Sequence, residues 1–161
     1  MGIRNLLILG GIGFAAWKAK GLLQLSDQLS MSISGLSIPT VSEGVLSTTV
    51  QLTAQNPTAG AVTINRVDIQ IYQLNADQTQ WQPFATGHSK EPQTIKPKGN
   101  TPLTFRISKA VSDVPELVKG VLDLIKGGQP MYKVVANVIL AGGIRHRVTE
   151  YYPSNAKEVL P

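Results

Sequence analysis

The sequence contains no cysteine, which excludes disulfide bonds, thiolate metal sites and a lipid-modified N-terminal cysteine. Charged residues are also few, at 16% of the chain, whereas hydrophobic residues reach 42% and suffice for a core. The length of 161 residues suits one domain with an appendage.

Side chains that perform catalysis or bind metals are sparse. The two histidines, His88 and His146, have no metal ligand at a useful spacing, and we interpret both as lone surface residues. No Gly-x-Ser-x-Gly elbow, phosphate loop or calcium loop occurs, and the carboxylates are scattered singly. We therefore expect a protein that is not an enzyme, that needs no metal or other cofactor and that has no small-molecule substrate.

Positive charge is in excess at the N-terminus. Residues 1–26 hold Arg4, Lys18 and Lys20 and no acidic residue, while the remainder is nearly balanced, with twelve Lys or Arg against ten Asp or Glu. This distribution favours anionic lipid headgroups. A nucleic-acid partner is not expected, because it would require basic residues clustered on the folded domain with aromatic residues among them. Arg145-His146-Arg147 is dense in basic groups, and we interpret it as a solvated strand end.

An uncharged run, Leu6–Trp17, precedes Lys18 and Lys20. Its twelve residues are fewer than the ~20 that span a bilayer, but lysine stems that reach the headgroups lengthen such a segment. Small residues recur every fourth position at Gly11, Ala15 and Ala19, as in a helix-packing face. We predict an N-terminal apolar helix that anchors the chain to a membrane. The anchor residues are Leu6, Leu7, Ile8, Leu9, Ile12, Phe14, Trp17, Lys18 and Lys20.

Two alternatives for this segment stay open, namely a helix packed inside a protein assembly and a cleaved signal peptide. Gly11-x-Gly13-x-x-Ala16 imitates a dinucleotide-binding fingerprint, but that motif needs a βαβ unit and an acidic residue about 20 positions later. Asp27 comes too early and strand-like segments follow, so we reject a nucleotide site.

From Leu29 onward, hydrophobic and polar residues alternate with a period of two, which predicts a β-sandwich of about seven strands. Parity shifts at Asn65-Arg66 and predicts a bulge, Pro83 predicts an edge strand, and Gly142-Gly143 predicts a hairpin. The predicted strands are Ser30–Ile38, Leu46–Gln55, Val62–Ile71, Trp81–Ser89, Leu103–Ile107, Tyr132–Leu140 and Ile144–Tyr151.

One short helix is predicted between the strands Leu103–Ile107 and Tyr132–Leu140. It begins near Asp113 and Pro115 and ends at Gly127-Gly128. Its apolar stripe is expected to cover the core, or else to dock a partner. The Asn75–Gln80 and Lys90–Asn100 segments are predicted loops and are the first places to look for contacts, because loops at sandwich ends often bind.

Several short motifs follow one another in a characteristic order. They are Gln55-Asn56-Pro57-Thr58, Val62-Thr63-Ile64 with Val67–Tyr72, Phe84-Ala85-Thr86-Gly87, Ile95–Thr101 and Tyr132-Lys133-Val134. Together they resemble the LEA14-like domain of late-embryogenesis-abundant type 2 proteins, also called the water-stress-and-hypersensitive-response domain, over roughly residues 30–153. The motif residues to follow are Asn56, Pro57, Gly87, Pro97 and Gly99.

The resemblance implies an immunoglobulin-like or fibronectin-III-like sandwich without catalytic residues, and a role in membrane-tethered binding or stress protection. We accordingly expect an anchor over residues 1–26, a sandwich over 27–153 and a tail over 154–161. The expected function is a non-enzymatic, membrane-associated structural or binding module whose partners are membrane lipid and one or more proteins. Two alternatives are a minor structural protein of a large assembly, such as the membrane or capsid of a lipid-containing virion, and a protein that protects against desiccation.

Overall fold

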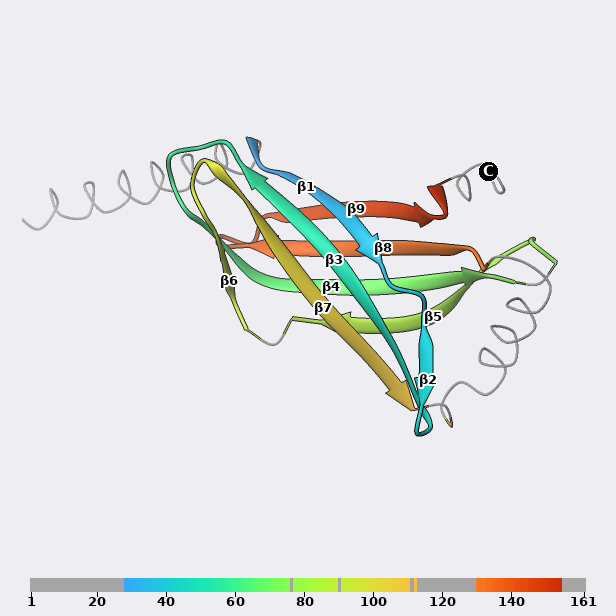
Figure 1. Cartoon of the computed structure of the whole chain (residues 1–161). Coiled ribbons are helices and arrows are strands. Elements are labelled where there is room, and N and C mark those ends of the chain that lie inside the picture. Colours follow the sequence, from blue (N-terminus) through green and yellow to red (C-terminus); the bar gives the residue numbers. More distant parts are fainter. Residues whose placement is uncertain (1–27, 76, 90, 111, 113–129, 155–161) are drawn as a thin grey trace, which may run out of the picture.

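The computed structural model describes residues 28–75, 77–89, 91–110, 112 and 130–154, which form two antiparallel β-sheets packed as a sandwich (Figure 1). The all-β architecture predicted from the period of two is confirmed. Its strands are β1 (Ser30–Leu36), β2 (Thr40–Ser42), β3 (Val45–Asn56), β4 (Val62–Leu74), β5 (Trp81–His88), β6 (Gln93–Ile95), β7 (Gly99–Ala110), β8 (Tyr132–Leu140) and β9 (Arg145–Tyr152).

Each sheet is built around long central strands. In the first sheet β3 lies in the middle, with β7 paired along one side and β1 and β2 following each other along the other. In the second sheet β4 and β8 are central, β9 forms one edge, and β5 and β6 share the other. Figure 1 shows the two layers crossing at an angle, as expected for twisted sheets.

The core lies between the inner faces of the two sheets. Along β7, Leu103, Phe105 and Ile107 are buried while the residues between them are exposed, as the alternation predicts. Phe105 keeps only 7% of its surface exposed, so its predicted inward face is confirmed. The same core includes residues of every strand except β2 and the edge strand β9, whose Val148 and Tyr152 pack against it.

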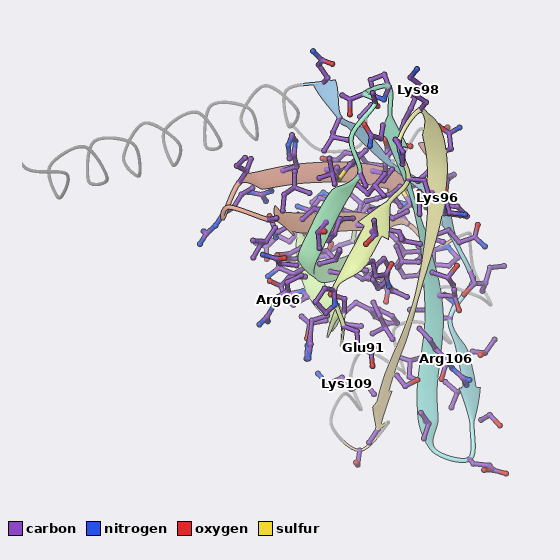
Figure 2. The ribbon with its side chains drawn as sticks, turned by 90° about the vertical axis from the view of Figure 1, so that its left-hand side faces the viewer. Arg66, Glu91, Lys96, Lys98, Arg106 and Lys109 are labelled. Carbon is purple, nitrogen blue, oxygen red and sulfur yellow. The ribbon has the colours of Figure 1, made fainter. Side chains whose placement is uncertain are left out.

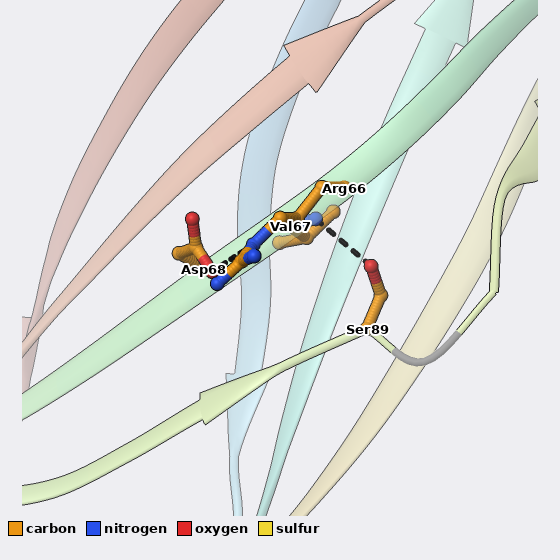
Figure 3. A network of polar contacts seen from close by, with 4 residues as sticks. All are labelled: Arg66, Val67, Asp68 and Ser89. Atoms are coloured by element: carbon orange, nitrogen blue, oxygen red, sulfur yellow. Dashed lines mark hydrogen bonds and ion pairs between the residues drawn. The ribbon is translucent and has the colours of Figure 1, made fainter.

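The predicted bulge in β4 is confirmed. The register between β4 and β8 shifts between Ile64 and Arg66, so that the buried positions change parity from Ile64 to Val67. Figure 3 shows the contacts beside this shift: Arg66 Nε donates to Asp68 Oδ1 at 2.7 Å, and Ser89 Oγ accepts the Val67 N–H at 2.9 Å. The Arg66–Asp68 pair is half exposed and contributes about 1 kcal/mol or less to stability.

Two further sequence predictions about the strands are confirmed. Strand β5, which contains Pro83, lies at an edge of its sheet and shows a register shift opposite this proline. Strands β8 and β9 form a hairpin whose turn places Gly142 and Gly143 at φ values of 85° and 78°. Only glycine adopts this left-handed region without steric cost, which explains the glycine pair.

The prediction of about seven strands needs a correction. Among the described residues there are nine, because two three-residue strands, β2 and β6, join the seven longer ones. Strand β6 and the start of β7 lie inside Lys90–Asn100, which was predicted to be a loop, and β1 ends at Leu36 instead of Ile38. Three residues are too few to display a period, so such strands are defined only by the partner that they pair with.

Several predictions fall on residues that the structure does not describe. The anchor over residues 1–26, the helix expected from Asp113 to Gly127 and nearly all of the 154–161 tail lie outside the described residues. Within the described part of the chain, no helix combines the length and the apolar character that a membrane crossing requires.

Candidate functional site at the basic end of the sandwich

One end of the sandwich gathers the start of β1 and three connections between strands. Ser30 pairs with Gln55 near the end of β3, and Asn56 pairs with Gly99 at the start of β7. The β8–β9 turn lies at the same end, because Ala141 donates its N–H to the carbonyl of Thr63. We call this end, with the connections 57–61, 96–98 and 141–144, the basic end.

Asn56 organises the β3–β4 connection from a fully buried position. Its Nδ2 donates to the Gly60 carbonyl at 2.7 Å, and its Oδ1 accepts from the Thr58 N–H at 3.1 Å and from the Thr58 hydroxyl at 2.7 Å. Pro57 restricts Asn56 to an extended backbone conformation, which suits the last position of a strand. Asn56 therefore has a structural role, since its side-chain amide replaces backbone partners that the turn lacks.

The β6–β7 turn is fastened to this connection. Lys98 donates its backbone N–H to the Thr58 carbonyl at 2.9 Å, and Lys96 donates its own to the Thr101 hydroxyl at 3.2 Å. Lys98 has a φ of 49°, a conformation that is uncommon for a residue with a Cβ. Hydrogen bonds thus fix the backbone of the turn while the lysine side chains stay exposed.

Four of the five motif residues meet at this end, and three of them line a surface hollow. The hollow is bounded by Gln55, Asn56, Pro57, Lys98, Gly99 and Asn100. Pro97 is the exposed residue between the two lysines of the turn. The pairing of β3 with β7 therefore brings together Asn56 and Gly99, which are 43 positions apart in the sequence.

Gly87 lies elsewhere, where β5 approaches β7. A Cβ at this position would lie 2.8 Å from Cγ1 of Ile107, closer than carbon atoms of neighbouring side chains can approach. The absence of a side chain therefore allows the edges of the two sheets to pack closely. Its role is in the sandwich and is independent of the hollow.

Charge is distributed unequally between the two ends. The basic end carries Lys96, Lys98 and the exposed Arg145, which directly follows the β8–β9 turn, and its three connections contain no acidic residue. At the far end, the β2–β3 turn and the described part of the β4–β5 loop contain Glu43 and Asp77 and no Lys or Arg. Figure 2 shows Lys96 and Lys98 toward the end where β1 begins, with Lys109 at the other end of β7.

The sequence named Lys90–Asn100 as a place to look for contacts, but it did not show that Lys96 and Lys98 are exposed on a fixed backbone. The left-handed backbone of Lys98 and the location of Arg145 at the same end of the sandwich depend on pairings between distant strands, so no local pattern reveals them. The alternation of β9 also separates Arg145-His146-Arg147, since both arginines are exposed and His146 is half-buried. His146 was expected to be a surface residue. Its Nε2 is instead buried and has no hydrogen-bond partner among the described residues.

A second cluster of large side chains lies on the outer face of the second sheet. Lys133 Nζ lies 4.7 Å from the ring centroid of Tyr72 and 5.5 Å from that of Trp81, and the Trp81 and Tyr151 rings are 5.8 Å apart. Cation–π contacts at partly exposed sites contribute about 0.5–1 kcal/mol each. The cluster joins β4, β5, β8 and β9 and stabilises the sheet.

Two tyrosines near the edge of the core have altered acidity. Burial raises the pKa of Tyr132 to about 12, and its ring packs edge-on against Phe84 at 5.6 Å. Burial, and to a lesser extent the nearby Glu150 carboxylate, raises the pKa of Tyr152, whose hydroxyl donates to the Ile33 carbonyl at 3.1 Å. Both shifts result mainly from burial at the edge of the core.

Metal ligands do not converge in the part of the chain that the structure describes. No group of three or more His, Cys, Asp or Glu side chains there is placed to hold a metal ion. His88 and His146 lie on β5 and β9, the opposite edges of the second sheet. The basic end offers exposed cations above a fixed backbone, which suits binding of an anionic surface better than a chemical reaction.

Solved structures with the same sandwich come from distant organisms. A crystal structure of a protein from Archaeoglobus fulgidus matches 74% of this chain and 92% of its own, with a TM-score of 0.51 and 15% identity. A solution structure from Arabidopsis thaliana matches 75% of this chain and 77% of its own, with a TM-score of 0.55 and 14% identity. These likenesses define the fold class, a small β-sandwich of two antiparallel sheets.

A third solved structure, described as a late embryogenesis abundant protein, matches 89% of this chain and 82% of its own, with a TM-score of 0.50 and 16% identity. The sequence profile of the family described as late embryogenesis abundant protein matches residues 51–149, which is more than half of the chain. The chain therefore belongs to the late embryogenesis abundant protein family, and the resemblance seen in its motifs is confirmed. No curated protein matches the sequence.

Proposed function

We propose that this protein is a non-enzymatic binding module of the late embryogenesis abundant family that its N-terminal segment tethers to a membrane. The observation that carries the proposal is the position of the basic end. The sandwich begins at Ser30, at the end whose connections bear Lys96 and Lys98, and the apolar run Leu6–Trp17 comes before it in the sequence. The tether would enter the bilayer, and the basic end, where β1 begins, would face the headgroups of the same membrane.

The composition of the tether supports a membrane partner. Leu6–Trp17 is uncharged over twelve residues, and Arg4, Lys18 and Lys20 flank it without an acidic residue. Burial of apolar side chains in hydrocarbon supplies the main attraction, and each basic residue near an anionic surface adds about 1 kcal/mol. Neither contribution requires catalysis, a cofactor or a nucleic acid.

Alkaline extraction of membranes tests the proposal. The full chain should stay in the membrane pellet, whereas a chain that begins at residue 27 should be released and stay folded. A full-length variant carrying Ile8→Asp and Ile12→Asp should also be released, because two carboxylates in the apolar run cost several kcal/mol in hydrocarbon. Ser26→Asp, which adds an acidic residue outside the run, serves as the control and should stay in the pellet. Release of the unmodified full chain would overturn the membrane tether and favour packing of residues 1–26 in a protein assembly, such as a virion.

Family membership favours a second candidate function, protection during water stress. The observation behind it is the profile match over residues 51–149. Cells that overproduce the protein should survive drying better than cells that produce a sandwich destabilised in its core by Phe105→Ala. Equal survival of the two strains at equal protein levels would reject this role.

A further inference from the structure

The basic end has a fixed backbone and exposed cationic side chains. Lys98 is fastened to Thr58 and Lys96 to Thr101 through backbone hydrogen bonds, so their Cα positions are set by the strands and not by a mobile loop. Asn56, which is fully buried, holds the other wall of the hollow. Two lysines are thereby presented on the same turn, with Gln55 and Asn100 as neutral neighbours.

The basic residues near this end differ in whether a carboxylate neutralises them. Arg66 is neutralised by Asp68 at 2.7 Å, so it contributes little to the attraction of an anion. Lys96, Lys98 and Arg145 are exposed, and none of them forms an ion pair with another described residue. The glutamate labelled in Figure 2, Glu91, precedes β6 and pairs with none of them among the described residues.

The tether restricts how far the basic end can lie from the bilayer. Lys20, the last basic residue of the anchor, comes ten residues before Ser30. A fully extended chain spans at most ~3.6 Å per residue, so Ser30 lies within roughly 36 Å of Lys20. Within that reach the basic end can rest directly on the headgroups, where Lys96 and Lys98 come inside the Debye length of about 8 Å at physiological ionic strength.

We infer that the basic end docks on the anionic headgroups of the membrane that holds the tether, with Lys96 and Lys98 directed at headgroup phosphates. The occupant is an anionic lipid surface, because the exposed charges of this end are all positive and the tether keeps the end close to the headgroups. The far end, with Glu43 and Asp77, then points away from the bilayer and is open to other partners. This inference rests on the proposed membrane tether and specifies how the sandwich is oriented on it.

The absence of cysteine makes a direct test practicable, since one introduced cysteine is the only thiol to label. The full chain carries a fluorophore at Ala59→Cys, on the basic end, or at Gln80→Cys, on the far end; both positions are exposed. It is reconstituted into phosphatidylcholine vesicles with or without about one third phosphatidylglycerol, and headgroup spin labels quench the probe according to its distance.

The inference predicts strong quenching at position 59 in anionic vesicles, at least about twofold weaker quenching in neutral vesicles or at high salt, and little quenching at position 80. Lys96→Gln with Lys98→Gln should reduce quenching at position 59 to the neutral-vesicle level. The matched control Lys109→Gln removes one exposed charge from the far end of β7 and should leave it unchanged.

Failure of the inference and failure of the tether are distinguishable. If the chain floats with the vesicles but quenching at position 59 ignores both lipid charge and the lysine substitutions, the orientation is wrong while the tether stands. If the chain does not float with either kind of vesicle, the tether itself is wrong. All the substituted residues are exposed, so the variants are expected to fold. Circular dichroism of each variant checks this.

Discussion

Polar residues buried inside this sandwich differ in how many of their hydrogen-bonding atoms have a partner. Asn56 is fully buried and uses both ends of its amide, whereas the Tyr132 hydroxyl is buried without a hydrogen-bond partner among the described residues. Tyr132 of β8 pairs directly with Gln73 of β4, whose Oε1 is also unpartnered in the described part of the chain. A buried polar atom without a partner costs ~1–3 kcal/mol, so this pair of positions is a local weakness in the core.

Replacing Tyr132 with Phe is expected to leave stability at pH 7 unchanged or to raise it by about 1 kcal/mol, because it removes an unpartnered hydroxyl while keeping the ring beside Phe84. The pH dependence should change as well. The phenol has a pKa of about 12 in the folded chain and an ordinary value of 10.0 when unfolded. Its contribution is thus fully present below pH 10 and is lost as the pH rises toward 12, when only the unfolded state releases the proton.

Urea unfolding at pH 8 to 12 measures both effects. The wild-type protein should lose stability more steeply than Tyr132→Phe above pH 10, by up to about 2 kcal/mol. Tyr151→Phe, at a half-exposed ring on β9, is the control and should parallel the wild type. A destabilised Tyr132→Phe at pH 7 would mean that the hydroxyl has a partner.

At the scale of elements, the close contact between the two sheets depends on a position without a side chain. Strand β5 lies at the edge of its sheet and approaches β7 of the other sheet at Gly87, opposite Ile107. The long pairing of β3 with β7 then places the β6–β7 turn beside the β3–β4 connection. Packing between sheets and the geometry of the basic end therefore share the strand β7.

Gly87→Ala is expected to destabilise the protein by about 1–3 kcal/mol, because its Cβ would overlap Ile107 Cγ1 at 2.8 Å. Chemical denaturation measures this loss. Gly99→Ala is the matched control, since its Cβ would meet only the Pro97 carbonyl at 3.7 Å, an ordinary contact. In an Ile107→Ala background the cost of Gly87→Ala should shrink, and an equal cost there would contradict steric overlap as the cause.

At the scale of the whole molecule, the sandwich forms its own core. The buried hydrophobic cluster among the described residues runs from Leu29 to Leu140, and Ile144, Val148 and Tyr152 pack against it. The described strands pair with one another into two sheets, and the unequal charge of the two ends gives the domain a direction. The described residues therefore supply a hydrophobic core without a contribution from residues 1–27.

Because the described core needs no residue before Leu29, a chain that begins at residue 27 is expected to unfold cooperatively. Its midpoint should lie within about 4 °C of that of the full chain in detergent, which corresponds to roughly 1 kcal/mol. Thermal unfolding followed by circular dichroism provides the comparison. A chain that begins at residue 37 lacks β1 and the buried Ile33, and it should unfold at a much lower temperature. Loss of cooperative unfolding on removing residues 1–26 alone would show that the core extends into them.

The sequence by itself determined the all-β class, the seven longer strands, the bulge beside Arg66, the edge position of the strand with Pro83 and the turn at Gly142-Gly143. These features follow from local causes, namely the period of two, the fixed φ of proline and the freedom of glycine. The order of the short motifs also indicated the family, because these motifs are local runs of sequence.

Only the tertiary structure decided which strands pair and what those pairings bring together. The strands β2 and β6 are too short for a period, Gly87 is explained by an atom of the opposite sheet, and Asn56 meets Gly99 through the register of β3 with β7. The physical reason is that alternation specifies which face of a strand is buried but leaves its partner open. The partner is chosen by the burial of complementary faces across the whole chain, and that choice places Lys96 and Lys98 at the same end of the sandwich as the start of β1.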